Sequence, residues 1–368
     1  MIEFEFLNKE KLARFIDSPA FNHLKNIPIS RHRAVAHIKN PSAADEDILL
    51  ILAYSGEELA GYLGILPDHI HLPDGRIEKC GWLSCIWVNA AIRGQGLGEQ
   101  LIRKALEKWD GKVLFTDYVP ATKSIYDKTG AFGKALVKTG IRIYVRADLH
   151  HILPPKRAFF KSCKPVFKFS DALMNALLDT RFLFYKKKPP PYRFQYVNQI
   201  DRETADFISK FQEKALFKRS AEELNWMLRY IWILSAPAGD FDSRRYHFSS
   251  LDRSFDFYCL RVFDDQERLV AFLVFAKRNR QLKLPYCFLE TTALPAVAAI
   301  INFHIAQWRV NTFTTFHPAL VKHLENGRTP GLLKKKITRH YLLTRILEEK
   351  IFSPDFYIQD GDGDGAFT

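Results

Sequence analysis

The glycine-rich segment from Arg93 to Gly98 has the residue types and spacing of a phosphate-binding turn. Its sequence is Arg-Gly-Gln-Gly-Leu-Gly. It follows the apolar stretch 82–88, which predicts a strand, and precedes the stretch 99–109, whose apolar residues have helical spacing. Glycine leaves the backbone free to bend and to be approached closely, and N–H groups at a helix N-terminus point at one spot. The sequence therefore predicts a pyrophosphate cradle near residue 96.

Two common phosphate-binding motifs do not fit this segment. A dinucleotide fingerprint needs G-x-G-x-x-G with an acidic residue about 20 residues further on, whereas the glycines here are spaced G-x-G-x-G. A P-loop needs G-K-[ST], whereas Gly98 is followed by Glu99 and Gln100. The arrangement Arg93-x-x-Gly96-x-Gly98 resembles the R/Q-x-x-G-x-G/A motif of the GNAT acetyltransferases, whose ligand is acetyl-coenzyme A.

The elements expected around this motif follow the order of the GNAT family over residues 1–147. The expected helices are 9–21, 99–109 and 120–128, and the expected strands are 48–54, 59–65, 82–88, 112–119 and 141–146. The segment Tyr126-Asp-Lys-Thr-Gly130-Ala-Phe132 is similar to the family's Y-x-K-x-G-F segment. The resemblance implies an α/β fold of the α+β sandwich type, in which a mixed, mostly antiparallel twisted sheet is flanked by helices.

The resemblance also implies roles for individual residues. The expected cofactor contacts are Trp87, Val88, Arg93, Gly94, Gln95, Gly96, Leu97, Gly98 and Glu99. Backbone groups of Trp87 and Val88 would bind the pantetheine arm along a splayed strand edge. N–H groups of Gly94–Glu99 would hold the pyrophosphate, and Arg93 would add positive charge. Tyr126 would be the general acid that protonates the departing thiolate, because a phenol with a pKa of about 10 stays protonated at neutral pH.

The acceptor side of the site departs from the family pattern. The departures are Ala90 where Pro is common, Val119 where Asn is common, and the inserted Ala131. The strand 82–88 also carries no acidic residue that could deprotonate the amine. Glu78, Asp117 and a chain of water molecules all remain open as the base. Asp117 is also explained as a surface or helix-capping carboxylate, and Tyr126 as a packed helix tyrosine.

Residues 196–352 repeat the order of the first half. The turn between Glu290 and Ala296 is Thr-Thr-Ala-Leu-Pro, which contains neither glycine nor the Arg-x-x-Gly-x-Gly pattern. We therefore expect a tandem of two GNAT-like domains, of which the second is degenerate and does not bind coenzyme A in the same manner. The expected boundaries are 1–148 for the domain with the acetyl-coenzyme A site, 149–195 for a basic, proline-bounded linker with an amphipathic helix, 196–352 for the degenerate domain and 353–368 for an acidic tail.

Positive charge is concentrated in the expected linker. The chain has a net charge of +13, and residues 151–200 hold 10 Lys/Arg and 2 Asp/Glu, which contribute +8. Ser170 could cap a helix there, with Leu173, Met174, Leu177 and Leu178 as its apolar face. We expect this helix to pack across the two domains with solvated lysine ends. The alternatives are peripheral contact of residues 156–188 with an anionic membrane and binding of an anionic ligand or RNA.

Several other features limit the class of protein. The repeat Asp360-Gly-Asp-Gly-Asp-Gly365 begins like an EF-hand loop but lacks its final glutamate, so we expect a solvated acidic tail. The histidines, including His150-His151, have no partner cluster, and we expect no metal. The start of the chain does not resemble a signal peptide, and no apolar run approaches the roughly 20 residues of a membrane span. Five scattered cysteines are typical of reduced thiols in a cytoplasmic protein.

These observations predict an acyltransferase. It would move an acetyl or other short acyl group from acyl-coenzyme A to a small-molecule or peptide amine by direct attack in a ternary complex. The basic segment Ile27–Lys39 favours an anionic acceptor, although a solvated surface loop explains it equally. One alternative is a Fem-type aminoacyltransferase that uses charged tRNA, but the intact motif makes nucleic acid the less favoured partner. Another is a non-catalytic sensor of acyl-coenzyme A or an envelope precursor.

Overall fold

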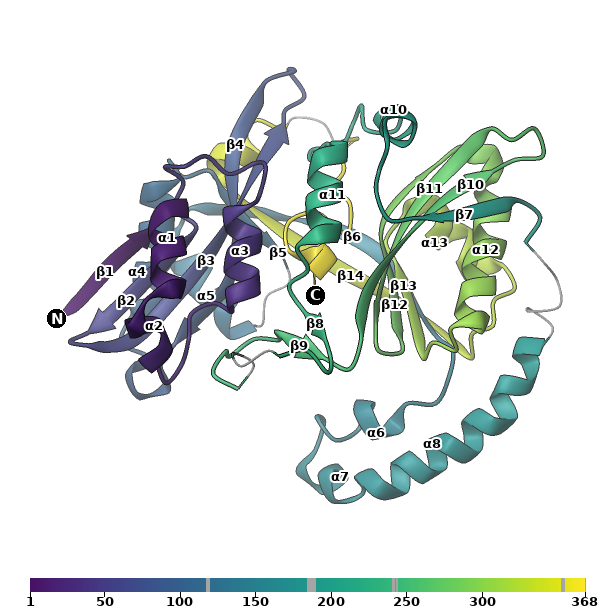
Figure 1. Cartoon of the computed structure of the whole chain (residues 1–368), viewed down its shortest axis with the longest axis horizontal. Helices are drawn as coiled ribbons and strands as arrows, with labels where there is room; N and C mark the ends of the chain where they lie inside the picture. The colour runs from purple at the N-terminus through teal and green to yellow at the C-terminus, as the bar shows by residue number, and fades with distance from the viewer. Residues whose placement is uncertain (117–119, 184–189, 240–241, 243, 352–354, 368) are drawn as a thin grey trace. The chain divides into compact units, whose positions relative to one another are not determined.

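The computed structural model describes residues 1–116, 120–183, 190–239, 242, 244–351 and 355–367 (Figure 1). The candidate residue Asp117 therefore lies outside the described residues. The chain divides into two compact units. Unit 1 comprises residues 1–138, 198–255 and 339–368, and unit 2 comprises residues 139–197 and 256–338.

Unit 1 contains a mixed, mostly antiparallel sheet with helices on both faces. Its elements are β1 (Ile2–Leu7), α1 (Lys9–Asp17), α2 (Pro19–His23), α3 (Arg31–Ile38), β2 (Leu50–Ser55), β3 (Glu58–His71), β4 (Ile77–Val88), η1 (Ala90–Ile92), α4 (Leu97–Lys108), β5 (Val113–Thr116), α5 (Pro120–Thr129), α10 (Arg202–Ser209), α11 (Ala221–Arg229), β8 (Leu234–Ser235), β9 (Leu251–Asp252), α14 (Arg345–Glu348) and η4 (Gly365–Phe367), with parts of β6 (Phe132–Tyr144) and β14 (Leu333–Thr344). The strands follow the order β1-β2-β3-β4-β5-β14-β6. β4 and β5 run parallel, whereas β1 to β4 pair with their neighbours in antiparallel fashion.

Alternation along β2 explains why this sheet is covered on both faces. Leu50 and Leu52 belong to an apolar cluster with residues of α1 and α3. Ile51 and Ala53 belong to a second cluster with residues of α4. Successive side chains of a strand point to opposite faces, so β2 is buried from both sides. The α4 residues of the second cluster are Leu97, Leu101, Ile102 and Ala105. Their burial fixes the N-terminus of α4 close to the end of β4.

Unit 2 repeats this arrangement. Its elements are α6 (Leu149–Ile152), α7 (Ala158–Ser162), α8 (Lys164–Leu178), η2 (Asp179–Arg181), β7 (Arg193–Val197), β10 (Phe255–Phe263), β11 (Leu269–Arg278), β12 (Gln281–Leu289), η3 (Thr291–Ala293), α12 (Leu294–Gln307), β13 (Thr312–Thr315) and α13 (Pro318–Asn326), with parts of β6 and β14. Here β12 and β13 run parallel, as β4 and β5 do in unit 1.

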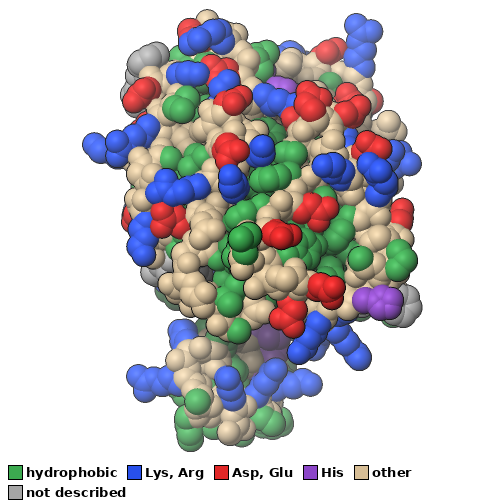
Figure 2. Space-filling view, turned by 90° about the vertical axis from the view of Figure 1, so that its left-hand side faces the viewer, with side chains coloured by type: hydrophobic (Ala, Val, Ile, Leu, Met, Phe, Trp, Pro, Cys, Tyr) green, Lys and Arg blue, Asp and Glu red, His purple; other side chains and the backbone are tan. Residues whose placement is uncertain are grey.

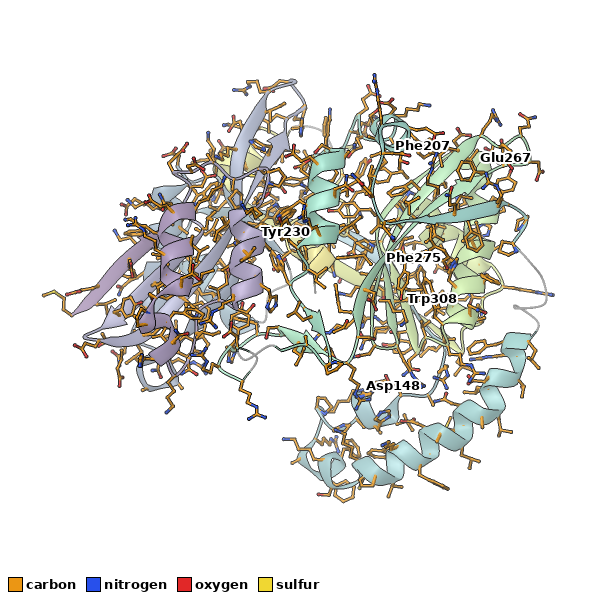
Figure 3. All side chains as sticks on the ribbon, in the orientation of Figure 1. Asp148, Phe207, Tyr230, Glu267, Phe275 and Trp308 are labelled. Carbon is orange, nitrogen blue, oxygen red and sulfur yellow. The ribbon has the colours of Figure 1, made fainter. Side chains whose placement is uncertain are left out.

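Aromatic side chains join α12 to the sheet of unit 2. Phe275 of β11 and Trp308 after α12 pack edge to face, with ring centroids 5.9 Å apart (Figure 3).

The two repeated series exchange their last strands. β5 of the first series pairs with β14 of the second, and β13 of the second pairs with β6 of the first. As a result β6 and β14 each contribute residues to both units. The compact units therefore do not follow the continuous boundaries 1–148 and 196–352, because strand pairing joins residues that are far apart in the sequence.

Helix α8 forms within the expected linker, but it packs through its polar face and not through its apolar face. Asp171 and Asn175 are buried, whereas Leu173, Met174 and Leu177 are exposed. The expectation that the apolar face packs across the domains is therefore wrong. The physical reason is that the polar pair satisfies backbone groups: Asp171 accepts hydrogen bonds from two N–H groups of α6, and Asn175 exchanges two with Ala147. No helix within the described ranges is both long and apolar enough to cross a membrane.

The C-terminal acidic segment is buried, so the expectation of a solvated tail is also wrong. Between Ile358 and Phe367 every residue is buried except Asp364. The carboxylates are neutralised by arginines, since Asp360 pairs with Arg339 and Asp362 accepts a hydrogen bond of 2.9 Å from Arg219. Buried charges require such partners.

Aromatic packing fixes the same segment. The ring of Phe367 stacks on Trp232 with centroids 4.2 Å apart and an interplanar angle of 5°. Gly363 has a φ of +66°, and a Cβ there would lie 2.5 Å from the ring of Trp82. Only glycine tolerates both the conformation and the close contact. The tail is thus an integral part of the core of unit 1.

We expect Phe367→Ala to lower the free energy of unfolding by about 3 kcal/mol, because it removes a fully buried ring from this core. Phe159→Ala is the matched control, since Phe159 is 72% exposed and its removal should change stability little. Urea unfolding followed by tryptophan fluorescence measures both variants. Equal effects of the two substitutions would contradict the packing role of the tail.

Candidate functional site

A β-bulge near the end of β4 is the centre of the candidate site. Gly64 of β3 pairs with Ser84, whereas Tyr62 pairs with Trp87, so Cys85 and Ile86 both oppose one residue of β3. Cys85 adopts a φ of +57°, in the left-handed region that side chains other than glycine rarely occupy. A bulge bends its strand and re-aims side chains. It therefore turns the last residues of β4 away from the regular ladder.

The edge of β4 that faces β5 is open beyond this point. Within the described residues, the two parallel strands pair at Gly81 with Val113 and at Trp82 with Leu114 and no further along β4. β5 continues to pair on its other side up to Thr116. The residues of β4 from Cys85 to Val88 are all partly exposed. Among the described residues, this stretch of β4 therefore offers unpaired backbone groups to a ligand, and it contains the predicted contacts Trp87 and Val88.

The predicted cradle follows at the end of the same strand. Gly94 and Gly96 have φ values of +85° and +82°, and α4 begins at Leu97, two residues before the expected start. The backbone N–H groups of Gly94, Gly96, Leu97, Gly98 and Glu99 donate to no protein acceptor among the described residues. The first N–H groups of a helix have no partner within the helix and carry partial positive charge. This turn therefore presents a group of free donors suited to an anion.

The remaining predicted cradle residues lie in or beside this turn. The N–H of Gln95 is directed back to the carbonyl of Ile92 at 3.4 Å, so it is less free than its neighbours. The Nε atom of Arg93 donates to the carbonyl of Val88 at 3.0 Å, which ties the turn to the strand. The Glu99 side chain is paired with Arg103 at 2.8 Å, so its backbone, not its carboxylate, faces the turn.

Tyr126 of α5 is almost fully buried. Its ring stacks on Phe115 of β5 at 3.6 Å and meets Phe132 edge to face. Burial raises the pKa of Tyr126 above its usual value, and the Asp364 carboxylate adds to that shift. The phenol is therefore protonated at neutral pH. Its hydroxyl has no hydrogen-bond partner among the described residues, and the ring belongs to the apolar cluster that packs against α4.

Helix α3 supplies a functional residue that the sequence did not identify. Residues 27–39 were expected as a loop, but Arg31–Ile38 form a helix in which Arg33 and His37 are buried. Burial together with Arg33 lowers the pKa of His37 well below its usual range, so this ring is neutral. The burial of Arg33 and His37 contradicts the alternative that residues 27–39 are a solvated surface loop. The segment had no helical apolar periodicity that could have revealed this.

Arg33 reaches the bulge of β4. Its guanidinium donates to Cys85 Sγ at 2.7 Å, to Ser84 Oγ at 2.9 Å and to the Tyr246 hydroxyl at 3.0 Å. Trp232 covers its face at 3.9 Å. Although burial opposes its charge, the neighbouring Cys85, Tyr246 and Asp364 raise the pKa of Arg33. A permanent positive charge therefore lies directly behind the bulge.

The carboxylate of Asp364, in the C-terminal tail, is joined to this cluster by a hydrogen bond. The Ser84 hydroxyl donates to its Oδ2 atom at 2.7 Å. Ser84 thus stands between Arg33 and Asp364 and connects the two charges. No sequence signal marked this residue, because 280 positions separate it from Ser84.

Glu78, one of the candidates for the base, does not reach this cluster. It lies near the start of β4 and accepts ion pairs from Lys350 at 2.6 Å and from Lys112 at 3.3 Å. The hydrogen bond from Lys350 is the main cause of its lowered pKa. Glu78 lies seven residues before Cys85, which corresponds to roughly 20 Å along an extended strand. Asp117 lies outside the described residues.

The corresponding position in unit 2 has a different architecture. Between β12 and α12 the chain forms η3, and no residue there has a positive φ. Pro295 at the start of α12 has no N–H group. Ala293, which caps this helix, is buried. The turn therefore lacks the left-handed glycines that shape the turn before α4.

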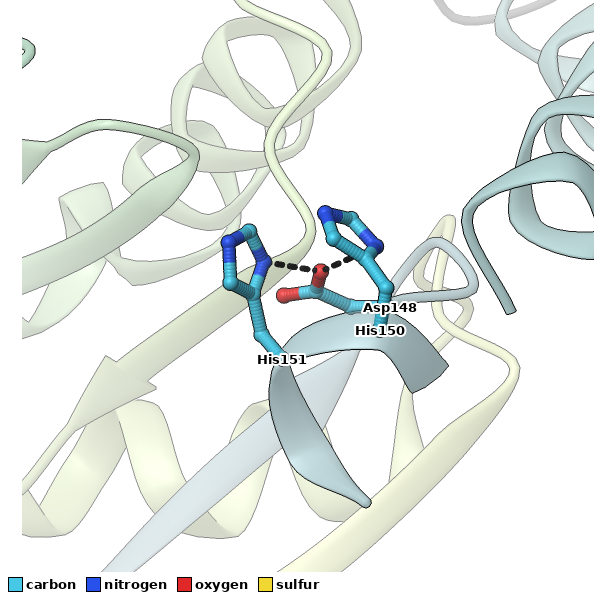
Figure 4. A group of neighbouring side chains, drawn as sticks. All are labelled: Asp148, His150 and His151. Carbon is cyan, nitrogen blue, oxygen red and sulfur yellow. Dashed lines mark hydrogen bonds and ion pairs between the residues drawn. The ribbon is translucent and has the colours of Figure 1, made fainter. Parts of the chain in front are cut away.

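Two histidines of unit 2 have carboxylate partners. Asp148, His150 and His151 place one ligand atom each within 4.8 Å of one another (Figure 4), so the expectation that these histidines have no partner cluster is wrong. Nδ1 of His151 lies 2.7 Å from Asp148, and Nδ1 of His150 lies 2.6 Å from Asp171. Such residue types can bind transition metals. Here each ring already has a carboxylate partner, and the group joins α6 to α8.

Comparison with known proteins places the site in a family context. Residues 16–117, which include β2 to β5 and the glycine turn, match the family model described as the acetyltransferase (GNAT) family. No curated protein matches the chain.

Solved structures share the fold at low sequence identity. A GCN5-related N-acetyltransferase from Anabaena variabilis is 13% identical with a TM-score of 0.50, and the match covers 93% of this chain and 72% of that one. A conserved protein of unknown function from Enterococcus faecalis, described as a probable N-acyltransferase, is 10% identical with a TM-score of 0.52 over 94% and 72%. N-myristoyltransferase of Saccharomyces cerevisiae with bound myristoyl-CoA is 11% identical with a TM-score of 0.50 over 93% and 80%.

Proposed function

Because the chain carries an acetyltransferase (GNAT) family domain over residues 16–117, we propose that it transfers an acyl group from acyl-coenzyme A to an amine. Acetyl is the proposed group, and the proposed acceptor is a small molecule or peptide. The single observation that carries this proposal is the juxtaposition at the end of β4. An open strand edge is followed directly by a turn with free N–H donors. The edge suits an amide-containing arm and the turn suits a pyrophosphate.

The chemistry that this geometry favours is direct attack by the amine on the thioester. The Trp87–Val88 edge would place the thioester beside the bulge, and the α4 turn would hold the phosphates. Tyr126 would donate a proton to the sulfur as the carbon–sulfur bond breaks. The main contribution of the protein is then to hold the two substrates together.

The glycine turn favours acyl-coenzyme A over charged tRNA as the ligand, because a tRNA-dependent aminoacyltransferase does not need a pyrophosphate cradle. A non-catalytic sensor of acyl-coenzyme A would use the same turn, and turnover with an amine separates it from an enzyme. Unit 2 has no glycine turn before α12, so we propose that it binds no coenzyme A. Titration calorimetry should therefore give about one equivalent of acetyl-coenzyme A per chain.

We expect Gly96→Val to weaken acetyl-coenzyme A binding by at least about ten-fold, since a side chain at a φ of +82° shifts the backbone that aims the donors. Gly75→Val is the matched control, because Gly75 has a φ of +85° and equally open surroundings in another turn. Both variants should lose about 1–2 kcal/mol of stability. Calorimetry with acetyl-coenzyme A separates the two effects, and unchanged affinity of the Gly96 variant would refute the cradle.

Tyr126→Phe should lower kcat by about 100-fold or more and leave the Kd for acetyl-coenzyme A nearly unchanged, because only the proton donor is lost. Tyr54→Phe on β2 is the control and should keep full activity. Steady-state kinetics and calorimetry on the same preparations give both quantities. Full activity of the Tyr126 variant would remove the residue from the mechanism.

A second proposal concerns the outer stripe of α8, defined as Val166, Phe169, Leu173 and Leu177. These residues recur every three or four positions and are each between 60% and 74% exposed. They therefore form a single apolar line on the helix. Buried Asp171 holds the opposite face, so the line is directed outward.

The charges around the outer stripe are positive. Lys161, Lys164 and Lys168 are exposed beside it, and Figure 2 shows basic and apolar side chains together at the bottom of the view. The acids of this region are engaged elsewhere, since Asp171 is buried and Asp179 pairs with Arg146 at 2.8 Å. An apolar line flanked by lysines suits the surface of an anionic membrane. We propose that this face binds such a surface peripherally.

We expect the wild-type protein to co-float with phosphatidylserine-containing vesicles at low salt and to be released at high salt. Leu173→Gln should weaken binding on the order of ten-fold, because it removes apolar area from the lipid boundary. Leu333→Gln is the matched control, since both leucines are 60% exposed. Absence of co-flotation at low salt, or equal effects of the two substitutions, would contradict the proposal.

A further inference from the structure

The candidate site contains a proton donor and a place for the cofactor, but the group that deprotonates the amine has not been identified. An amine attacks a thioester only as the neutral base, whereas alkylamines are protonated at neutral pH. We propose that the Asp364 carboxylate, supplied by the C-terminal tail, binds the acceptor ammonium and acts as its catalytic base. This inference rests on the proposed function and names the acceptor as a protonated primary amine.

Asp364 is the partly exposed residue of the tail. Of the residues from Ile358 to Phe367, Asp364 alone is not buried. Its Oδ2 atom accepts from Ser84, and its Oδ1 atom has no partner among the described residues. Asp364 is therefore the one partly exposed residue of this stretch, and it has a carboxylate oxygen without a protein partner among the described residues.

Asp364 lies beside the bulge of β4. Ser84 directly precedes Cys85, the bulged residue at which β4 turns toward its open edge. The hydrogen bond of 2.7 Å to Ser84 therefore fixes Asp364 at the bulge. If the thioester lies along Trp87 and Val88, the carboxylate is at the point where an incoming amine must approach.

The residues on both sides of Asp364 are fixed by contacts. Asp362, on one side of Asp364, is held by Arg219. Phe367, on the other side, is stacked on Trp232. A functional group that is fixed from both sides keeps its geometry during a reaction. The free oxygen is thus held in place without using its own hydrogen-bonding capacity.

Other ionisable groups around Asp364 are compatible with this role. Arg33 of α3 is permanently charged and reaches the carboxylate through Ser84. Cys85 of β4 and Tyr246 complete the Arg33 cluster. Burial, and after it the charge of Asp364, raise the pKa of Tyr126 of α5.

The proton balance of the step is complete with these groups. Asp364 takes one proton from the ammonium, and the nitrogen lone pair forms the carbon–nitrogen bond. The carbon–sulfur bond breaks and its electron pair leaves on sulfur, which receives the phenolic proton of Tyr126. The second nitrogen proton then restores Tyr126. Asp364 releases its proton to solvent, so the products are an amide, coenzyme A and one proton.

The test compares two amines with acetyl-coenzyme A as donor. Butylamine is protonated at neutral pH and needs a base, whereas hydroxylamine is largely neutral and does not. Asp364→Asn should lower kcat/KM for butylamine by about 100-fold or more at pH 7 and should keep most of the rate with hydroxylamine. Asp364→Glu should recover part of the butylamine rate. Free coenzyme A is measured by chromatography, with Tm and the Kd for acetyl-coenzyme A as folding controls.

Asp362→Asn separates this role from a structural one. It weakens an anchor of the same tail but removes no accessible carboxylate, so it should affect the two amines equally. Ser84→Ala removes the hydrogen bond to Asp364 and should lower the butylamine rate more than the hydroxylamine rate. This variant tests the inference if Asp364→Asn does not fold.

Equal loss with both amines, or no loss, in Asp364→Asn overturns the assignment. If the wild-type protein acylates neither amine, the proposed function fails and this inference fails with it.

Discussion

The buried guanidinium of Arg33 holds together the part of unit 1 on which the candidate site depends. A cation without solvent is costly unless its hydrogen bonds are satisfied, and Arg33 meets this requirement through Cys85, Ser84 and Tyr246. These partners come from β4 and from the segment that follows β8. Through Ser84 the same interaction also reaches the tail at Asp364. One charge therefore sets the relative positions of four distant segments.

The conformation of Cys85 is a consequence of that interaction and a condition for the site. A left-handed residue within a strand is unfavourable unless neighbouring contacts stabilise it, and the hydrogen bond from Arg33 is such a contact. Among the described residues β4 and β5 are not paired beyond Trp82, so the unpaired edge of β4 leads through η1 to the glycine turn. The proposed cofactor edge and the proposed base at Asp364 thus lie at the same distortion of β4.

The sequence predicted the local parts of this arrangement and missed the distant ones. The turn at Gly94–Gly98 was evident because its determinants are glycines within a few positions, and the repeated order of elements was evident from periodicity. Arg33, in contrast, lies in a helix with weak amphipathic character, and its partners are up to 213 positions away. The packed face of α8 was misjudged because two polar residues, Asp171 and Asn175, satisfy backbone groups that no sequence pattern reveals. Buried polar contacts, more than apolar ones, limited the prediction.

The exchange of last strands gives the second series a function that does not depend on a ligand of its own. β14 belongs to that series, yet it pairs with β5 of the first, and the tail follows β14 directly along the chain. Asp364 can therefore reach Ser84 only after the chain has passed through all of unit 2. To supply β14 and the tail, the second series does not need a second phosphate-binding turn. The segment before α12 accordingly contains no glycine. The acceptor side of the candidate site is then a product of both halves of the chain, whereas the cofactor side is encoded within residues 77–108 alone.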